Sequence, residues 1–155
     1  MAMDMFIQIG ALKGESRDSV HKEKTDVLAW SWGMSNSGSA HVGGGAGAGK
    51  VNVQDLSFTK YIDKTSTELM LASCNGKHFP DALLIVRKAG EKPVEYLKIK
   101  MEDVLVSSYQ AAGAEGSNNE TPSEQISINF AKIEFDYTAP DGTLSSFNFD
   151  IRANR

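Results

Sequence analysis

Hydrophobic and polar residues alternate along most of the chain, which is the period of β-strands rather than of helices. This alternation predicts about eight strands, and Ala89–Pro93 has the length and composition of a hairpin turn between two of them. The apolar positions change phase near Gln54 and again near Ala131, which predicts a β-bulge at each place. The predicted strands cover residues 5–9, 25–34, 51–61, 82–88, 94–101, 104–110, 125–137 and 144–151.

One segment departs from the strand period and predicts a helix. Thr65 and Glu68 have the spacing of a capping box, after which Leu69 and Ala72 recur at helical spacing. Gly76 then supplies a left-handed stop. About eight strands with a single helix predict an all-β fold, an antiparallel barrel or a sandwich, formed by one domain over residues 1–155.

The predicted strand over residues 25–34 has two unlike faces. Leu28, Trp30, Trp32 and Met34 fall on one face, and Val27, Ala29, Ser31 and Gly33 on the other. A face that merely meets water normally carries some Lys or Glu, and the small face carries none. The pattern therefore favours a strand that packs on another subunit or lines a crowded passage.

A long glycine-rich loop follows that strand. No residue from Val27 to Gly49 carries a charge if His41 is neutral, and the part from Ser37 to Gly49 contains six of the fourteen glycines. Such a long loop between two strands is usually functional or disordered, because it fixes backbone without burying side chains.

Composition excludes several classes of protein. The chain has 155 residues, 41% hydrophobic and 23% charged, as in an ordinary globular domain. The net charge is −4 and the basic residues form no run, so nucleic acid is not an expected partner. The single cysteine, Cys74, allows no internal disulfide and indicates a reducing cytoplasm. The amino terminus has no signal-peptide pattern, and no stretch is apolar enough for a membrane helix.

One motif resembles the phosphate-binding loop of nucleotide hydrolases. Gly44, Gly49 and Lys50 have its spacing, but Val51 stands where that loop needs Ser or Thr for magnesium. The following residues favour a strand, whereas the phosphates require a helix N-terminus there. The nucleotide interpretation is therefore disfavoured.

The other candidate residues predict neither catalysis nor cofactor binding. His21, His41 and His78 lack metal-site spacing to one another or to Cys74, which is most simply a small buried residue. We expect no catalytic, metal or cofactor site.

Several long blocks of the sequence together point to a known family; they are residues 4–7, 13–16, 26–33, 50–60, 76–80, 104–109 and 128–137. These blocks resemble the hemolysin-coregulated protein, Hcp, of bacterial type VI secretion. The resemblance implies a structural protein without enzymatic activity, a β-barrel with one helix whose hexameric rings stack into a secretion tube.

The resemblance also implies partners and positions. Ala29 and Ser31 would point into the ring lumen and contact small effector proteins carried there, and the tryptophans would point to the barrel core. The expected partners are further copies of the chain, the sheath, the tip spike and these effectors, with no membrane insertion. We expect the protein to pass from the cytoplasm to the outside without a cleaved signal peptide. The loop positions that would contact neighbouring subunits or rings are Ser37, Gly38, His41, Gly43, Gly44, Gly45, Gly47 and Gly49.

One alternative remains open on the residues alone. A monomeric barrel or jelly roll could bind a small ligand or glycan at its loop end, although the loop over residues 37–49 has no aromatic residue for such a site.

Overall fold

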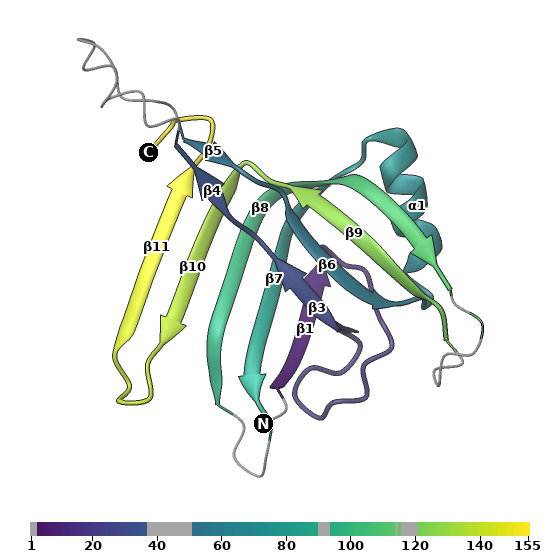
Figure 1. Cartoon of the computed structure of the whole chain (residues 1–155), viewed down its shortest axis with the longest axis horizontal. Helices are drawn as coiled ribbons and strands as arrows, with labels where there is room; N and C mark the ends of the chain where they lie inside the picture. Colours follow the sequence, from purple (N-terminus) through teal and green to yellow (C-terminus); the bar gives the residue numbers. More distant parts are fainter. Residues whose placement is uncertain (1–2, 37–50, 90–93, 114, 116–120) are drawn as a thin grey trace.

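A computed structural model describes residues 3–36, 51–89, 94–113, 115 and 121–155. Within these residues the protein is mainly β, with antiparallel pairing and one helix, which confirms the predicted class (Figure 1). The elements are β1 (Met3–Ile9), β2 (Thr25–Asp26), β3 (Ala29–Ser31), β4 (Met34–Ser35), β5 (Asn52–Val53), β6 (Leu56–Tyr61), α1 (Ser66–Asn75), β7 (His78–Lys88), β8 (Glu95–Ala112), β9 (Ser123–Asn129), β10 (Lys132–Thr138) and β11 (Leu144–Asp150).

The described residues form eleven strands rather than about eight, because the predicted boundaries fall differently. The strand expected over residues 25–34 is three short strands, and the expected bulges near Gln54 and Ala131 are complete breaks between strands. Conversely, the two strands expected over residues 94–101 and 104–110 are the single strand β8. Asp103, with a φ of 54°, lies inside it without ending it.

β8 organises the main sheet, whose order is β2-β1-β7-β8-β9-β6-β3. Its first half pairs with β10, where Glu102 lies opposite Lys132, and its second half pairs with β9, where Leu105 lies opposite Asn129. β11 extends the sheet beyond β10. At the break between β9 and β10 the chain therefore passes from pairing with the second half of β8 to pairing with its first half.

A single segment links the two ends of this sheet order. β2 pairs with β1 and β3 pairs with β6. Between them, the Val27 N–H donates to the Met5 carbonyl at 2.9 Å and the Leu28 N–H to the Thr59 carbonyl at 2.8 Å. Because the chain changes partner here, Val27 turns into the core, and the expectation that it shares the small face with Ala29 is wrong.

The apolar core lies on one side of the sheet strands and under the helix. Trp30 and Trp32 are half-buried and pack against it, as expected, whereas Leu28 and Met34 are exposed. The largest fully buried apolar side chains are Ile7, Leu56, Phe58, Leu69, Leu84, Val86, Ile99, Met101, Ile126 and Ile128.

Helix α1 begins differently from the prediction. Thr65 makes no side-chain cap, so the expected capping box with Glu68 is wrong. Instead, the Asp63 carboxylate accepts hydrogen bonds from the Thr65 N–H at 2.9 Å and from its hydroxyl at 2.6 Å. The helix ends as predicted: Gly76 has a φ of 68° and its N–H donates to the Ala72 carbonyl.

The polar loop over residues 13–24 covers the outer side of β1 and β7. Phe6 and Ile85 lie opposite each other on that side and are buried beneath it. The His21 ring lies 4.9 Å from the Phe6 ring, and Arg87 forms hydrogen bonds with Asp18 of the loop. The Arg87 hydrogen bond holds the pKa of Asp18 well below its usual value.

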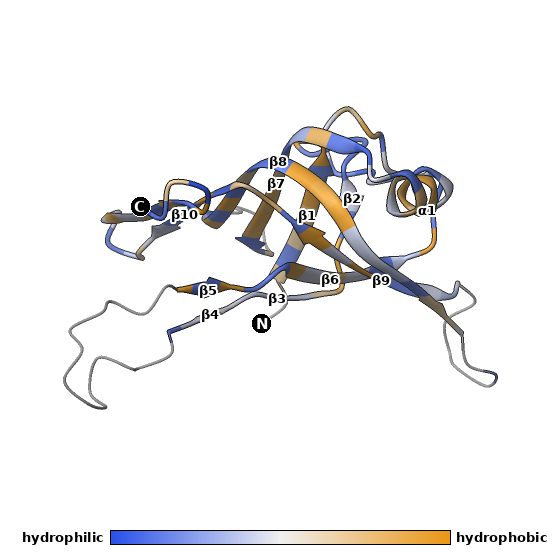
Figure 2. Ribbon diagram, turned by 90° about the horizontal axis from the view of Figure 1, so that it is seen from above, coloured by the Kyte–Doolittle hydropathy of each residue, from blue (hydrophilic) through white to orange (hydrophobic). Residues whose placement is uncertain are grey.

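β4 and β5 form a separate two-stranded sheet, called the arm below. Figures 1 and 2 show the arm at the end of the molecule that carries β10 and β11, away from α1. The Trp32 indole N–H donates to the Gln54 carbonyl at 3.0 Å, and its ring stacks on Phe135 at 6.3 Å. These contacts fix the base of the arm against β10.

Candidate functional site

The small face predicted for β3 is an exposed surface of the subunit. Ala29 lies opposite Thr59 of β6, and Ser31 lies opposite Ser57. Ala29 and Ser31 are both exposed. Directly opposed residues of antiparallel strands share a face, so the small face of β3 continues onto β6.

The same face extends over two further strands. Three cross-strand rows run from β3 or β6 through β9 to the second half of β8, and none of their residues is charged. We call this surface the charge-free face. Its rows are Ser31, Ser57, Ser127 and Ser108; Ala29, Thr59, Gln125 and Gln110; and Tyr61, Ser123 and Ala112.

Within the face, two of the hydroxyl groups form a hydrogen bond with each other. The Ser57 and Ser127 Oγ atoms lie 2.8 Å apart across β6 and β9. At its rim the Asp55 carboxylate accepts hydrogen bonds from Ser107 at 2.6 Å and Asn129 at 2.8 Å. The surface therefore offers small hydroxyls, amides and methyl groups to whatever lies against it.

The charges of β6 and β9 lie on the core side, directly behind this face. Lys60 is opposite Glu124, both are fully buried, and the two form an ion pair. The Lys60 ammonium also donates to Asp63 at 2.9 Å, and the Ser66 hydroxyl donates to Glu124 at 2.8 Å. This cluster ties the first turn of α1 to the sheet.

The environment of the cluster shifts the pKa values of Tyr109 and Asp63. Burial raises the pKa of Tyr109 to about 12, and the hydrogen bond that its hydroxyl donates to Glu124 acts in the same direction. Burial also acts to raise the pKa of Asp63, but the hydrogen bonds from Thr65 and Lys60 outweigh it and hold that pKa below its usual value.

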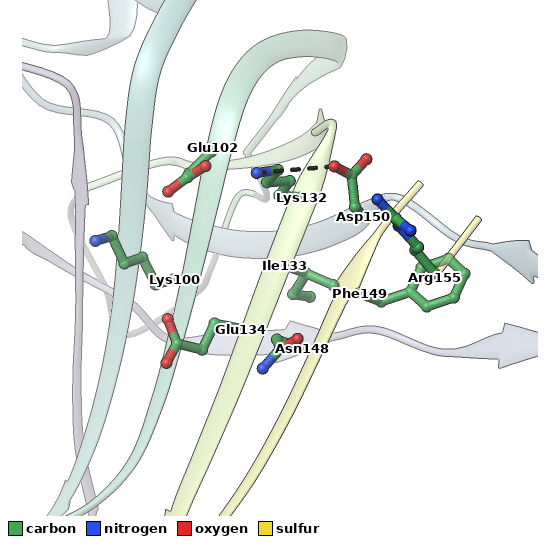
Figure 3. Close-up of a pocket in the computed structure, with 9 residues that line it drawn as sticks. All are labelled: Lys100, Glu102, Lys132, Ile133, Glu134, Asn148, Phe149, Asp150 and Arg155. Carbon is green, nitrogen blue, oxygen red and sulfur yellow. Dashed lines mark ion pairs between the residues drawn. The ribbon is translucent and has the colours of Figure 1, made fainter. Parts of the chain in front are cut away.

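The outer face of the other half of the sheet has the opposite character. Where β8, β10 and β11 pair, side chains of alternating charge surround a hollow of about 260 Å³ (Figure 3). Lys132 lies opposite both Glu102 and Asp150, and its ammonium is 3.7 Å from the Asp150 carboxylate. Glu134 lies opposite Lys100 in the next row. Such mutually balanced charges are typical of a solvated sheet face, so the charge-free face is the unusual half.

The two sets of predicted site residues lie in different parts of the chain, and their roles stay predictions. Ala29 and Ser31 lie on the charge-free face, which the structure extends to strands that the sequence reasoning did not connect with them. The missed signal was a row of small polar residues at alternate positions of β6 and β9, such as Ser57 with Thr59 and Gln125 with Ser127. The loop positions Ser37, Gly38, His41, Gly43, Gly44, Gly45, Gly47 and Gly49 lie outside the described residues.

Two histidines and the cysteine were the other residues considered for chemistry, and the structure shows what surrounds each of them. His21 is buried, with Nε2 2.5 Å from Glu95 and Nδ1 2.8 Å from the Lys24 ammonium. His78 is exposed beside Asp103. Cys74 is exposed at the end of α1, so the expectation that it is buried is wrong: the helix turns its other side to the core.

The described residues contain no group of three or more His, Cys, Asp or Glu side chains that could hold a metal ion. None of their helices has the length and apolar character that a membrane crossing requires. In addition, strand β5 follows the glycine-rich segment where a nucleotide site would need a helix, which further disfavours the phosphate-loop interpretation.

Comparison with known proteins points in one direction. Residues 6–137 match the family described as type VI secretion system effector, Hcp. The chain is 55% identical to Protein hcp1 of Pseudomonas aeruginosa, with 99% of this chain and 98% of that protein covered. Among solved structures, Hcp1 of Salmonella typhimurium is 34% identical with a TM-score of 0.86, covering 100% of this chain and 99% of that one. A type VI secretion system effector of Yersinia pestis is 36% identical with a TM-score of 0.79, covering 95% and 99%.

These matches cover nearly the whole chain in both sequence and fold, and the resemblance noted from the sequence is confirmed. The chain therefore belongs to the Hcp family of type VI secretion, whose members are secreted structural tube proteins rather than enzymes.

Proposed function

We propose that this chain forms hexameric rings that stack into the inner tube of a type VI secretion system, with the charge-free face lining the lumen. The observation that carries the proposal is the charge-free face itself, which spans four strands without one charged side chain. The family forms secretion tubes, so self-association of this chain fits its membership.

The chemistry of the face suits the wall of a passage for small effector proteins. Most side chains of the face are short, which leaves the lumen wide, and the absence of charge avoids strong attraction or repulsion of cargo of either sign. Ala29 and Ser31 would contact the cargo, together with Ser57, Ser127 and Gln125 of the neighbouring strands. The chain would thereby hold effectors in the lumen as a chaperone-like carrier.

The proposal includes further partners and a route. The sheath would enclose the tube and the tip spike would cap it, while residues 37–49 would contact neighbouring subunits or rings. The chain would leave the bacterial cytoplasm with the tube and without a cleaved signal peptide.

Absolute mass tests the ring. Light scattering during size exclusion should give about 100 kDa, the mass of six copies of the 16.8 kDa chain, and electron microscopy should show a central pore. A monomer under all conditions that favour assembly would contradict the proposal and favour a monomeric ligand-binding barrel.

The substitution Ser31→Gln tests the lumen. The variant should keep the ring mass but lose a small effector protein that co-purifies with the wild-type ring, because the longer side chain fills space that cargo needs. Ser19→Gln, in the exposed part of the loop over residues 13–24, is the matched control and should retain the cargo. Equal cargo retention by the Ser31→Gln ring would place the lumen on another face.

A further inference from the structure

The loop over residues 13–24, called the covering loop below, contains a histidine whose two ring nitrogens are both engaged. His21 is buried, and its ring lies 4.9 Å from the ring of Phe6 on β1. Its Nε2 atom is 2.5 Å from a Glu95 carboxylate oxygen on β8, and its Nδ1 atom is 2.8 Å from the Lys24 ammonium. One imidazole therefore connects the tip of the loop, its base and the sheet.

These partners require the neutral form of His21. A lysine ammonium carries only donors, so Nδ1 must accept its hydrogen bond as an unprotonated nitrogen. The single ring proton then lies on Nε2 and is donated to Glu95. A second proton could enter only on Nδ1, where it would point at the Lys24 ammonium 2.8 Å away. The observed contact with Lys24 and the protonated ring therefore exclude each other.

The carboxylate on the other side of the ring keeps a cation in either state. Glu95 lies 3.4 Å from the Lys98 ammonium of the same strand as well as beside His21. Burial acts to raise the pKa of Glu95, but the hydrogen bond with His21 and the charge of Lys98 outweigh it and hold that pKa below its usual value. The Glu95 carboxylate thus remains an acceptor for the ring when the ring gains a proton.

The other charges on this side of the sheet pair with one another rather than with the imidazole. Arg87 of β7 donates hydrogen bonds to Asp18 of the loop at 3.0 Å and to Asp4 of β1 at 3.3 Å. On β2, the Asp26 carboxylate bonds Ser16. A proton on the imidazole leaves these pairs as they are, so the group that has to move is the Lys24 ammonium.

We infer that His21 and Lys24 form an acid-sensitive catch for the covering loop. When the ring takes up a proton, as histidine side chains do between about pH 8 and pH 5, it keeps its bond to Glu95 and expels the half-buried Lys24 side chain towards solvent. The base of the loop is then no longer tied to the tip. The catch belongs to the single subunit and does not rest on the proposed ring.

The covering loop depends on such polar contacts because it contributes little apolar packing. Val20, its one aliphatic residue, is 67% exposed. At its base the Ser16 N–H donates to the Lys24 carbonyl at 2.9 Å. A segment with few buried apolar contacts opens at low cost in free energy. Loss of the catch should therefore let the loop open more often and expose Phe6 and Ile85 beneath it.

Hydrogen exchange at about pH 7.5 and pH 5.5, within the range in which histidine titrates, tests the catch. After correction for the intrinsic exchange rates, the amides of Ser16, Glu23 and Lys24, which are hydrogen-bonded within the loop, should exchange several-fold faster at the lower pH. Amides of β9 should keep their protection. Light scattering verifies that the assembly state is the same at both pH values.

Replacing the lysine should remove or reverse the acid response. In Lys24→Met a proton on His21 meets no like charge and strengthens the bond to Glu95, so acid should leave loop exchange unchanged or slow it. Lys22→Met, at an exposed position of the same loop, is the matched control and should keep the wild-type response. Loss of the response in both variants would point to the net charge of the loop and overturn the inference.

The ring itself supplies a second readout. In a chain with nitrogen-15 in its histidines, nuclear magnetic resonance should show the His21 ring at neutral pH with its proton on Nε2, and the signal is assigned by its absence in His21→Gln. His21→Gln should also make loop exchange independent of pH over this range. A neutral ring protonated on Nδ1, or loop exchange in Lys24→Met that accelerates in acid as in the wild type, would overturn the inference.

Discussion

Replacing Lys60 by Met should strongly destabilise the subunit. The change removes a fully buried ammonium that contacts Glu124, Asp63 and Ser66, and leaves the Glu124 carboxylate buried without a cation. Breaking a buried ion pair on one side costs about 3–5 kcal/mol. Tyr109 and Ser66 still donate hydrogen bonds to Glu124, so the lower end, about 3 kcal/mol, is the expected loss.

Urea unfolding followed by tryptophan fluorescence measures the loss, at matched concentrations because assembly also stabilises the folded chain. With a slope of about 2 kcal/mol per M, the midpoint should fall by roughly 1.5 M. Lys100→Met, at an exposed position of β8, is the matched control and should stay within about 0.5 kcal/mol of wild type.

The double variant Lys60→Met with Glu124→Gln separates lost charge pairing from lost packing. The neutral amide removes the stranded charge; its oxygen accepts from one of the two hydroxyls of Tyr109 and Ser66, and its NH2 group donates to the other, so the double variant should be more stable than Lys60→Met alone. A Lys60→Met variant as stable as the Lys100→Met control would refute the view that this cluster holds α1 to the sheet.

Two further predictions concern the loop over residues 13–24. Because Arg87 holds the pKa of Asp18 below its usual value, Asp18 stabilises the fold above about pH 4, and this contribution is lost as the pH falls. Asp18→Asn should therefore lower the free energy of unfolding at pH 7 and make it decline less steeply in acid. A decline as steep as that of the exposed control Asp81→Asn would contradict the pairing. Gly14→Ala should lower the free energy of unfolding by about 1–3 kcal/mol, because the new Cβ would lie 2.5 Å from the Thr25 hydroxyl oxygen and 2.6 Å from the Lys24 carbonyl oxygen. In the control Gly113→Ala the new Cβ meets nothing closer than 3.6 Å. Equal unfolding midpoints for the two variants would show that the loop shifts to accommodate the methyl group.

Strand periodicity predicted most of the fold because most strands of the main sheet have one face in the core, although β11 has no buried residue. It located the two-faced β3 and the phase changes near Gln54 and Ala131. It could not show that these changes are breaks at which the chain moves to another partner, since a bulge and a break produce the same shift of apolar phase. For the same reason, periodicity alone could not indicate that Val27 turns inward while Ala29 stays outside.

From the sequence, only the β3 border of the charge-free face could be predicted. Ala29 and Ser31 stand out because tryptophans alternate with them, whereas Ser57 and Thr59 alternate with ordinary apolar residues and look like any amphipathic strand. Their place beside Ser31 depends on register, which pairs residues far apart in the sequence. The predicted capping box is wrong for a related reason: Asp63, which accepts the hydrogen bonds of Thr65, lies outside the spacing of such a box, and its ion pair with Lys60 positions its carboxylate.

The buried cluster and the charge-free face are two consequences of one arrangement. Along β6 and β9 the charged residues Lys60 and Glu124 point inward, which is costly unless they pair, and their neighbours Thr59 and Gln125 point outward. Their ion pair, with the hydrogen bonds from Ser66 and Tyr109, offsets that cost and also fixes the helix. The strands thus hold their charge where it anchors α1 and present none of it on the proposed lumen wall, so a substitution that reversed this polarity should harm stability and cargo passage together.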